Sequence, residues 1–137
     1  MTSHPAPDGI FESFRRAEML LARQRPLDAL AALGPVLESR PDLVSVQLLA
    51  GRAYLDSAQL RRAEEAFSRV IDLDPAEHYA RFALGKALHR QGRLGEARTQ
   101  LRMAAAMDPR PEYQEALGEV RARLALEIDP NVPDNPS

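Results

Sequence analysis

The sequence repeats itself with a period of 34 residues. Proline recurs at Pro41, Pro75 and Pro109, and alanine recurs at Ala29, Ala63 and Ala97. In the same register lie a column of small residues (Ala17, Gly51, Gly85) and two columns of larger apolar residues (Leu20, Tyr54, Leu88 and Leu33, Phe67, Leu101). A fixed period of this length indicates stacked copies of one small unit, because a single copy cannot bury its own apolar face.

The recurring columns each have a physical reason. Residues with almost no side chain at 17, 51 and 85 allow the second helix of a unit to cross close to the first, and the alanines at 29, 63 and 97 supply the matching small surface. Larger side chains such as Tyr54 and Phe67 then fill the space beside the crossing, as dense packing requires. The same core contacts are therefore predicted three times over.

Helical spacing of apolar residues predicts six helices in pairs: 9–24 with 26–39, 42–57 with 60–73, and 76–91 with 94–107. Gly92 is expected in the turn of the third pair, where glycine ends a helix. Pro35 falls inside the second predicted helix, where proline removes a backbone hydrogen bond, so we expect a kink or an early end there.

A seventh helix is predicted over 111–127. Its apolar stripe consists of Tyr113, Ala116, Leu117, Val120 and Leu124, whereas Glu112, Glu115 and Glu119 lie mostly away from that stripe. Arg121 and Arg123 also lie mostly away from it. Terminal repeats need a polar outer face, so this helix is interpreted as a C-terminal cap. The alternative, a fourth repeat cut short, is disfavoured because no second helix is predicted after Asp129 and Pro130.

The two ends of the chain differ from its centre in composition. Residues 1–8 and 129–137 are rich in proline and small polar residues and are expected to be flexible tails. Between them we expect a single domain over 9–128, with repeats at about 10–43, 44–77 and 78–111.

Bulk composition excludes several classes of function. The net charge is −2, so nothing in it predicts attraction to nucleic acid or to an anionic membrane. The chain has no cysteine, which excludes disulfides and thiolate chemistry. It has no apolar leader or membrane-length apolar segment, so a cytoplasmic protein is expected, and its bias toward arginine and alanine suggests a bacterial genome.

No constellation of residues predicts catalysis, a metal or a cofactor. His4, His78 and His89 have neither metal-ligand spacing nor a nucleophile beside them. Acidic residues near the prolines, such as Asp74, are explained by capping of helix ends. We therefore expect a protein that is not an enzyme and holds no cofactor.

The second repeat carries the clearest motif. Ala50, Gly51 and Tyr54 are followed by Ala63 and Phe67, and Pro75 closes the unit. This spacing resembles the tetratricopeptide repeat family, whose unit is a helix-turn-helix with the pattern W-x2-LG-x2-Y, A-x3-F, P. No copy has the first aromatic residue of that pattern, because Ser13, Gln47 and Arg81 occupy its column. The resemblance implies an all-α, right-handed superhelical solenoid of three repeats plus the capping helix.

The resemblance also implies that the first helix of each repeat lines a concave groove. The candidate partner-binding residues on the matching columns are Phe11, Phe14, Arg15, Leu48, Arg52, Leu55, Tyr79, Phe82, Lys86, His89 and Arg90. Phe14, Leu48 and Phe82 share one column, which is either an exposed apolar ladder or ordinary packing between neighbouring first helices. Basic groups stand beside it, opposed by Glu18 and Asp56.

These residues favour a non-catalytic protein-interaction module, an adaptor or scaffold. The expected partner is a peptide or helix with apolar anchors and an acidic group. Binding of chaperone C-terminal tails is disfavoured, because Phe14, Glu18, Leu49, Tyr79 and Ala83 occupy the columns that hold the carboxylate-binding residues in that subtype. Two alternatives stay open: a homo-oligomer that pairs through the edge around Phe11, Phe14 and Met19, and an RNA-binding helical repeat, which the mild acidity disfavours.

Overall fold

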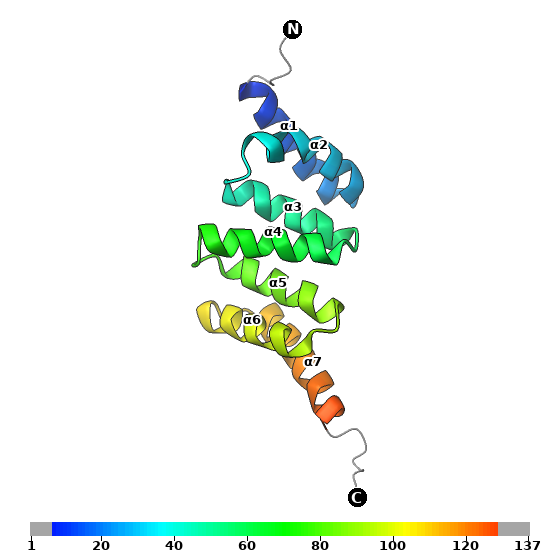
Figure 1. Ribbon diagram of the computed structural model, residues 1–137, viewed down its shortest axis with the longest axis vertical. Helices are drawn as coiled ribbons and strands as arrows, with labels where there is room; N and C mark the ends of the chain where they lie inside the picture. Colours follow the sequence, from blue (N-terminus) through cyan, green and yellow to red (C-terminus); the bar gives the residue numbers. More distant parts are fainter. Residues whose placement is uncertain (1–6, 129–137) are drawn as a thin grey trace, which may run out of the picture. The chain divides into compact units, whose positions relative to one another are not determined.

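The computed structural model describes residues 7–128, and all regular structure in that range is helical (Figure 1). The helices are α1 (Pro7–Ala22), α2 (Pro26–Ser39), α3 (Val44–Asp56), α4 (Leu60–Leu73), α5 (His78–Arg90), α6 (Leu94–Met107) and α7 (Pro111–Ile128). The predicted bounds of α2, α4 and α6 agree with the structure at both ends. The all-α helical repeat fold that the sequence predicts is confirmed.

Three helix starts differ from prediction, those of α1, α3 and α5, and α3 begins at Val44 rather than at 42. Pro7 and Asp8 belong to α1 rather than to a tail, while the rest of the predicted tails, 1–6 and 129–137, lies outside the described residues. Helix α5 begins at His78, later than predicted, with Glu77 as its N-cap. Asp74 ends α4 by donating its backbone N–H to the Val70 carbonyl at 2.7 Å.

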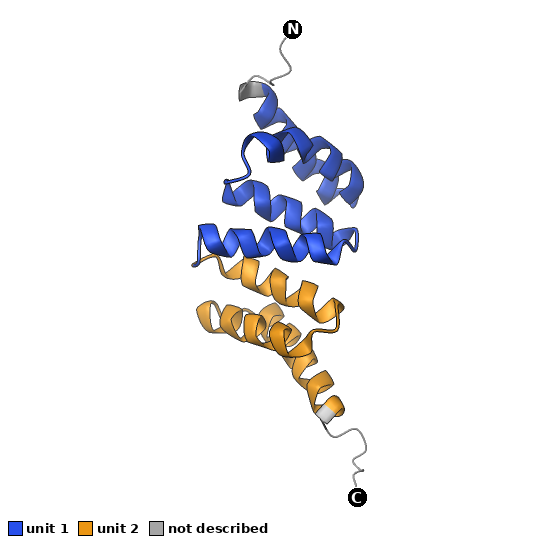
Figure 2. Ribbon diagram, viewed as in Figure 1, with its two compact units in different colours: residues 1–75 blue, residues 76–137 orange. Residues whose placement is uncertain are grey.

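By its internal contacts the chain divides into two compact units, residues 1–75 and residues 76–137 (Figure 2). In the first unit α1 packs on α2, α3 packs on α4, and α2 contacts α3. In the second unit α6 packs on both α5 and α7. The single domain over 9–128 and its exact repeat bounds stay predictions.

The hairpins α1–α2, α3–α4 and α5–α6 close through the same turn. A residue with left-handed backbone stands at the same point of each: Gln24 (φ 62°), Ala58 (φ 61°) and Gly92 (φ 80°). In each turn the N–H of this left-handed residue donates to the carbonyl three residues back, at 2.9, 3.1 and 2.9 Å in chain order. The N–H of the next residue donates to the carbonyl five residues back, at 2.9, 2.8 and 3.0 Å. This pair of bonds is a Schellman motif, which satisfies the last carbonyls of the first helix. The predicted role of Gly92 is confirmed.

The close helix crossings predicted from the small residues are present. A Cβ built on Gly51 would lie 2.6 Å from Cε1 of Phe67, and one built on Gly85 would lie 2.6 Å from Cγ of Leu101. Both contacting side chains are fully buried, and so are the alanines of the matching column (Ala29, Ala63, Ala97). At each glycine, the large side chain of the facing helix therefore fills the space that a methyl group would otherwise occupy.

Pro35 does not end its helix, so of the two predicted outcomes the early end is wrong, whereas the kink stays a prediction. Helix α2 continues to Ser39 with Pro35 inside it, and Leu33 and Val36 on either side of the proline are buried. Pro35 itself is exposed, and so is Ala31, whose carbonyl would receive the missing bond. Water can therefore satisfy that carbonyl, while the packing of the neighbouring apolar residues holds the helix together.

Within residues 7–128 no helix is both long enough and apolar enough to cross a membrane.

Candidate functional site

In the first unit, predicted groove residues from two helices meet at one concavity. Phe14 and Glu18 of α1 face Ser45, Leu48, Leu49 and Arg52 of α3 around a cavity of about 190 Å³. Phe14 also packs against the core, and it is half-buried, as is Leu48. Phe14 therefore combines the two predicted roles, because it packs against the core and also lines the cavity, whereas Leu48 is shown only as a half-buried lining residue.

The other predicted residues of this unit lie apart from that cavity. Phe11 is 60% exposed, and the Arg15 guanidinium lies 5.4 Å from the centre of its ring. Leu55 is only 6% exposed, so its side chain offers little surface to a partner.

In the second unit, the predicted basic residues surround a larger cavity of about 390 Å³. One wall is formed by Lys86, His89 and Arg90 of α5, and the floor by Phe82, Leu101 and Ala116. The opposite wall is formed by Glu112, Glu115 and Glu119 of α7. Opposite charges thus line the two sides of an apolar floor.

Phe82 lines the cavity with only a small part of its side chain and does not project into it. It is 8% exposed, and its ring stacks on Tyr113 with centroids 4.5 Å apart. The Lys86 ammonium lies 5.1 Å from the centre of the Phe82 ring, a distance at which the π electrons attract the cation. Tyr79 does not line the cavity, but its ring is 6.0 Å from that of Phe82.

A polar network holds α7 against α5. His78 Nδ1 is 2.9 Å from the Tyr113 hydroxyl, and His78 Nε2 is 3.2 Å from Asp108 Oδ2. A neutral imidazole satisfies both contacts when the hydroxyl donates to Nδ1 and Nε2–H donates to the carboxylate. Asp108 also accepts a 2.8 Å hydrogen bond from Arg110 Nε. Tyr113 is fully buried, and burial raises the pKa of its phenol above the ordinary value, which the charge of Arg110 partly offsets.

The acidic wall was missed by sequence reasoning, which assigned the glutamates of α7 to the outer face of a cap. The predicted apolar stripe is present, because Tyr113, Leu117 and Val120 are buried. The signal that sequence reasoning missed was the 34-residue repeat period. One more step of 34 residues from Phe82 reaches Ala116, so α7 continues the register of the first helices and one of its faces lines the cavity.

A match to a protein-family model identifies the repeat. Residues 48–111 match the tetratricopeptide repeat. This segment of the chain is therefore built of tetratricopeptide repeats. The matched segment includes the third hairpin, most of the second, and the five predicted groove positions of α5: Tyr79, Phe82, Lys86, His89 and Arg90.

Part of the chain is also similar to a stretch of a much longer curated protein. It is 32% identical over 72 residues to DnaJ homolog subfamily C member 3 of Bos taurus. The match covers 53% of this chain but only 14% of the relative.

Solved tetratricopeptide domains share the fold of this protein at low sequence identity. The first TPR domain of Spaghetti (RPAP3) bound to the HSP90 peptide SRMEEVD superposes with a TM-score of 0.81 at 15% identity, covering 90% of this chain and 99% of that one. The Sgt2 TPR domain of Aspergillus fumigatus superposes with a TM-score of 0.81 at 17% identity, covering 97% of this chain and 87% of that one. At such identities the likeness establishes the fold and leaves the ligand open.

Proposed function

We propose that this protein is a non-catalytic adaptor that binds a peptide or helix of a partner protein along the first helices of its repeats. The observation that carries the proposal is convergence of the predicted residues on concave surfaces: Phe14, Leu48 and Arg52 in the first unit, and Phe82, Lys86 and His89 in the second. Apolar surface beside fixed cations suits a ligand with apolar anchors and an acidic group.

The solved relatives support peptide binding as the mode of action. The RPAP3 domain was solved with an HSP90 peptide and its second TPR domain with an HSP70 peptide, and both peptides end in EEVD. This chain has apolar and buried residues, Leu49 and Ala83, in two of the columns expected to hold carboxylate-binding residues. We therefore propose a partner other than a chaperone tail. We also propose that the interaction takes place in the cytoplasm.

The test is a cross-linking pull-down from the native cell with a charge-reversed variant. Arg52→Glu with Lys86→Glu changes two exposed cations, one beside each cavity. Arg61→Glu with Arg102→Glu is the matched control, because it makes the same change of charge at exposed positions outside both cavities. We expect the groove variant to lose partners that the wild type and the control retain. Equal capture by all three folded proteins would refute the proposal.

A homo-oligomer is the second candidate function. It is favoured by exposed apolar side chains on α1, where Phe11 is 60% and Met19 is 45% exposed. Exposed apolar surface of this kind often marks a contact between proteins. A molecular mass that rises with protein concentration would favour this candidate over a monomeric adaptor.

A further inference from the structure

The cavity between α5 and α7 has two charged walls, and only the basic one is explained by a partner with an acidic group. Glu112, Glu115 and Glu119 follow one another along α7 at spacings of three and four residues and are all exposed. Like charges at such spacings repel and destabilise a helix by about 0.2–0.5 kcal/mol per pair. The stripe therefore weakens α7 unless positive charge from elsewhere compensates it.

Within the described part of the chain Arg110 attracts Glu112, but no ion pair supplies positive charge to the other two glutamates. Neither Glu115 nor Glu119 forms an ion pair or hydrogen bond with any residue in 7–128. Lys86, on the opposite wall, lies over the Phe82 ring instead of reaching a carboxylate. The carboxylates thus face the cavity ready to meet a cation from outside.

The acidic wall is also fixed in place. Tyr113 and Leu117 bury the opposite side of α7, and the His78 contacts to Tyr113 and Asp108 connect its first turn to α5. Because buried groups hold this wall, it loses little conformational freedom when a ligand binds. The entropic cost of binding is therefore small, and more of the favourable charge interaction contributes to affinity.

We propose that this cavity recognises a protein segment of mixed charge, with basic side chains placed against Glu115 and Glu119. An apolar side chain of the same segment covers Phe82 and Ala116, and an acidic group faces Lys86. A tail that carries only acids is rejected, because its carboxylates would stand opposite three glutamates across the cavity. This inference rests on the proposed function and specifies the partner class of the same site.

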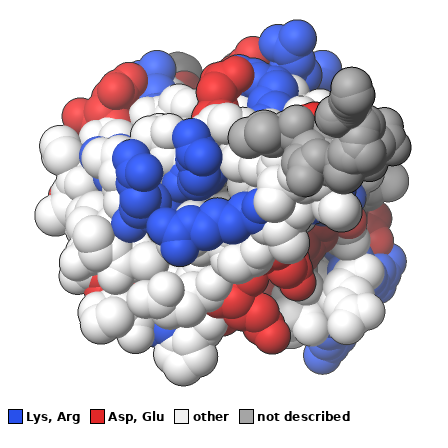
Figure 3. Space-filling view, turned by 90° about the horizontal axis from the view of Figure 1, so that it is seen from below, with Lys and Arg blue, Asp and Glu red and all other residues white. Residues whose placement is uncertain are grey.

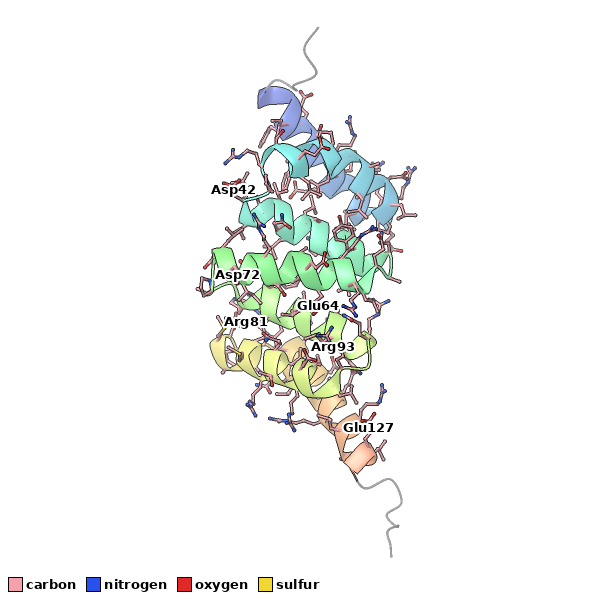
Figure 4. All side chains as sticks on the ribbon, in the orientation of Figure 1. Asp42, Glu64, Asp72, Arg81, Arg93 and Glu127 are labelled. Atoms are coloured by element: carbon pink, nitrogen blue, oxygen red, sulfur yellow. The ribbon has the colours of Figure 1, made fainter. Side chains whose placement is uncertain are left out.

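The experiment selects ligands without knowing the natural one. A random peptide library is panned against the full chain, and enriched peptides are measured for binding to the wild type and to two variants. Glu115→Lys with Glu119→Lys reverses the acidic wall. Glu38→Lys with Glu127→Lys makes the same change of net charge at exposed positions outside the cavity, and Figure 4 labels Glu127 near the end of α7.

Enriched peptides should combine apolar residues with lysine or arginine. Their affinity should fall by about tenfold or more on the wall variant and stay within about twofold on the control, as expected when a close charge pair is replaced by repulsion. Helicity by circular dichroism must match among the three proteins. If the lysine pair unfolds the chain, Glu115→Gln with Glu119→Gln replaces it and should still weaken binding.

The opposite outcomes are distinct. Peptides that bind the groove without basic residues, or that bind the wall variant equally, would overturn this inference and leave the proposed function standing. Absence of any enriched peptide would overturn both. A wild-type dimer that the wall variant converts to a monomer would also overturn the inference, since a second copy would then be the occupant.

Discussion

At the scale of single residues, two glycines set how closely the helices of a hairpin approach. Gly51 and Gly85 each stand where a Cβ would overlap a buried side chain of the facing helix. Gly118, in contrast, has nothing within 4 Å of the place where its Cβ would be. Glycine is therefore required at the first two positions for space, whereas at Gly118 it only weakens a helix.

We expect Gly51→Ala to lower the free energy of unfolding by about 1–3 kcal/mol, because Phe67 is fully buried and cannot move aside without repacking. Gly118→Ala should raise it by up to about 1 kcal/mol through helix propensity. Urea denaturation of both variants measures the two changes. A neutral Gly51→Ala would show that the crossing has room to relax.

The left-handed turn residue gives a second prediction at this scale. Gly92→Ala should cost about 1–2 kcal/mol, since a residue with a Cβ is strained at φ 80°. Ala58 already bears this strain at φ 61°, so Ala58→Gly should be neutral or stabilising despite the greater freedom of glycine in the unfolded chain. Thermal melts compare the pair, and a destabilising Ala58→Gly would contradict the argument.

Arg81 shows how a polar residue replaces the aromatic one that the family pattern has in its column. Its Nη1 donates to Gln100 Oε1 at 3.3 Å and lies 3.8 Å from Met103 Sδ, so the side chain connects α5 to α6 (Figure 4). Its Nε is buried without a hydrogen-bond partner in the described residues, which offsets part of this gain.

At the scale of helices, the burial of Tyr113 on α7 makes the stability of the fold depend on pH. The buried phenol has a raised pKa, so the folded protein keeps the proton that the unfolded chain releases above about pH 10. The stabilisation from this group is therefore complete below that pH and is lost as the pH rises through the folded-state value.

Tyr113→Phe should remove this pH dependence and the hydrogen bond to His78, at a cost of about 1 kcal/mol near neutral pH. Urea denaturation near neutral pH and at about pH 11 measures both effects. The wild type should lose more stability than Tyr113→Phe between the two conditions, and Tyr54→Phe serves as a control phenol without this bond. An equal loss in the wild type and Tyr113→Phe would argue against the network.

The sequence predicted the helices well because their ends carry local signals. Prolines follow α2, α4 and α6, and apolar spacing fills each helix, so those bounds were correct. The turn conformation at Gln24 and Ala58 was not predictable from residue type, since neither is a glycine. Their place in the 34-residue period beside Gly92 was the available signal.

The candidate site was harder to predict, because exposure depends on tertiary packing. Phe82 occupies the same repeat column as Phe14, yet the Tyr113 ring stacks on the Phe82 ring and leaves little of the Phe82 side chain accessible. The acidic wall of α7 could have been found by extending the repeat register past 111. Treating α7 as a cap hid this, because a polar face is typical both of a cap and of a binding surface.

At the scale of the whole molecule, the formal charges nearly balance, with 18 lysine and arginine residues against 20 acidic ones. On the face that Figure 3 shows, basic and acidic side chains gather in separate groups and neither sign covers the face. A net charge of −2 gives little overall attraction to a charged partner, so the proposed binding depends on local patterns of charge.

A monomeric adaptor predicts a molecular mass that does not depend on concentration. We expect light scattering to give the mass of one chain, 15.2 kDa, across a wide concentration series. If the mass rises, Phe11→Ser should reverse the rise, because Phe11 is the most exposed aromatic side chain of the described residues. Reversal would establish the homo-oligomer as the better interpretation.

The three matching turns make each hairpin complete in itself. Gln24, Ala58 and Gly92 adopt one conformation at one point of the period, so all three connections have the same backbone geometry, although a side chain at that point adds strain. Duplication or deletion of a whole period would leave every remaining hairpin properly closed, whereas insertion of a single residue in a turn would break its hydrogen bonds. The length of such a chain can therefore change in whole periods without opening any turn that remains.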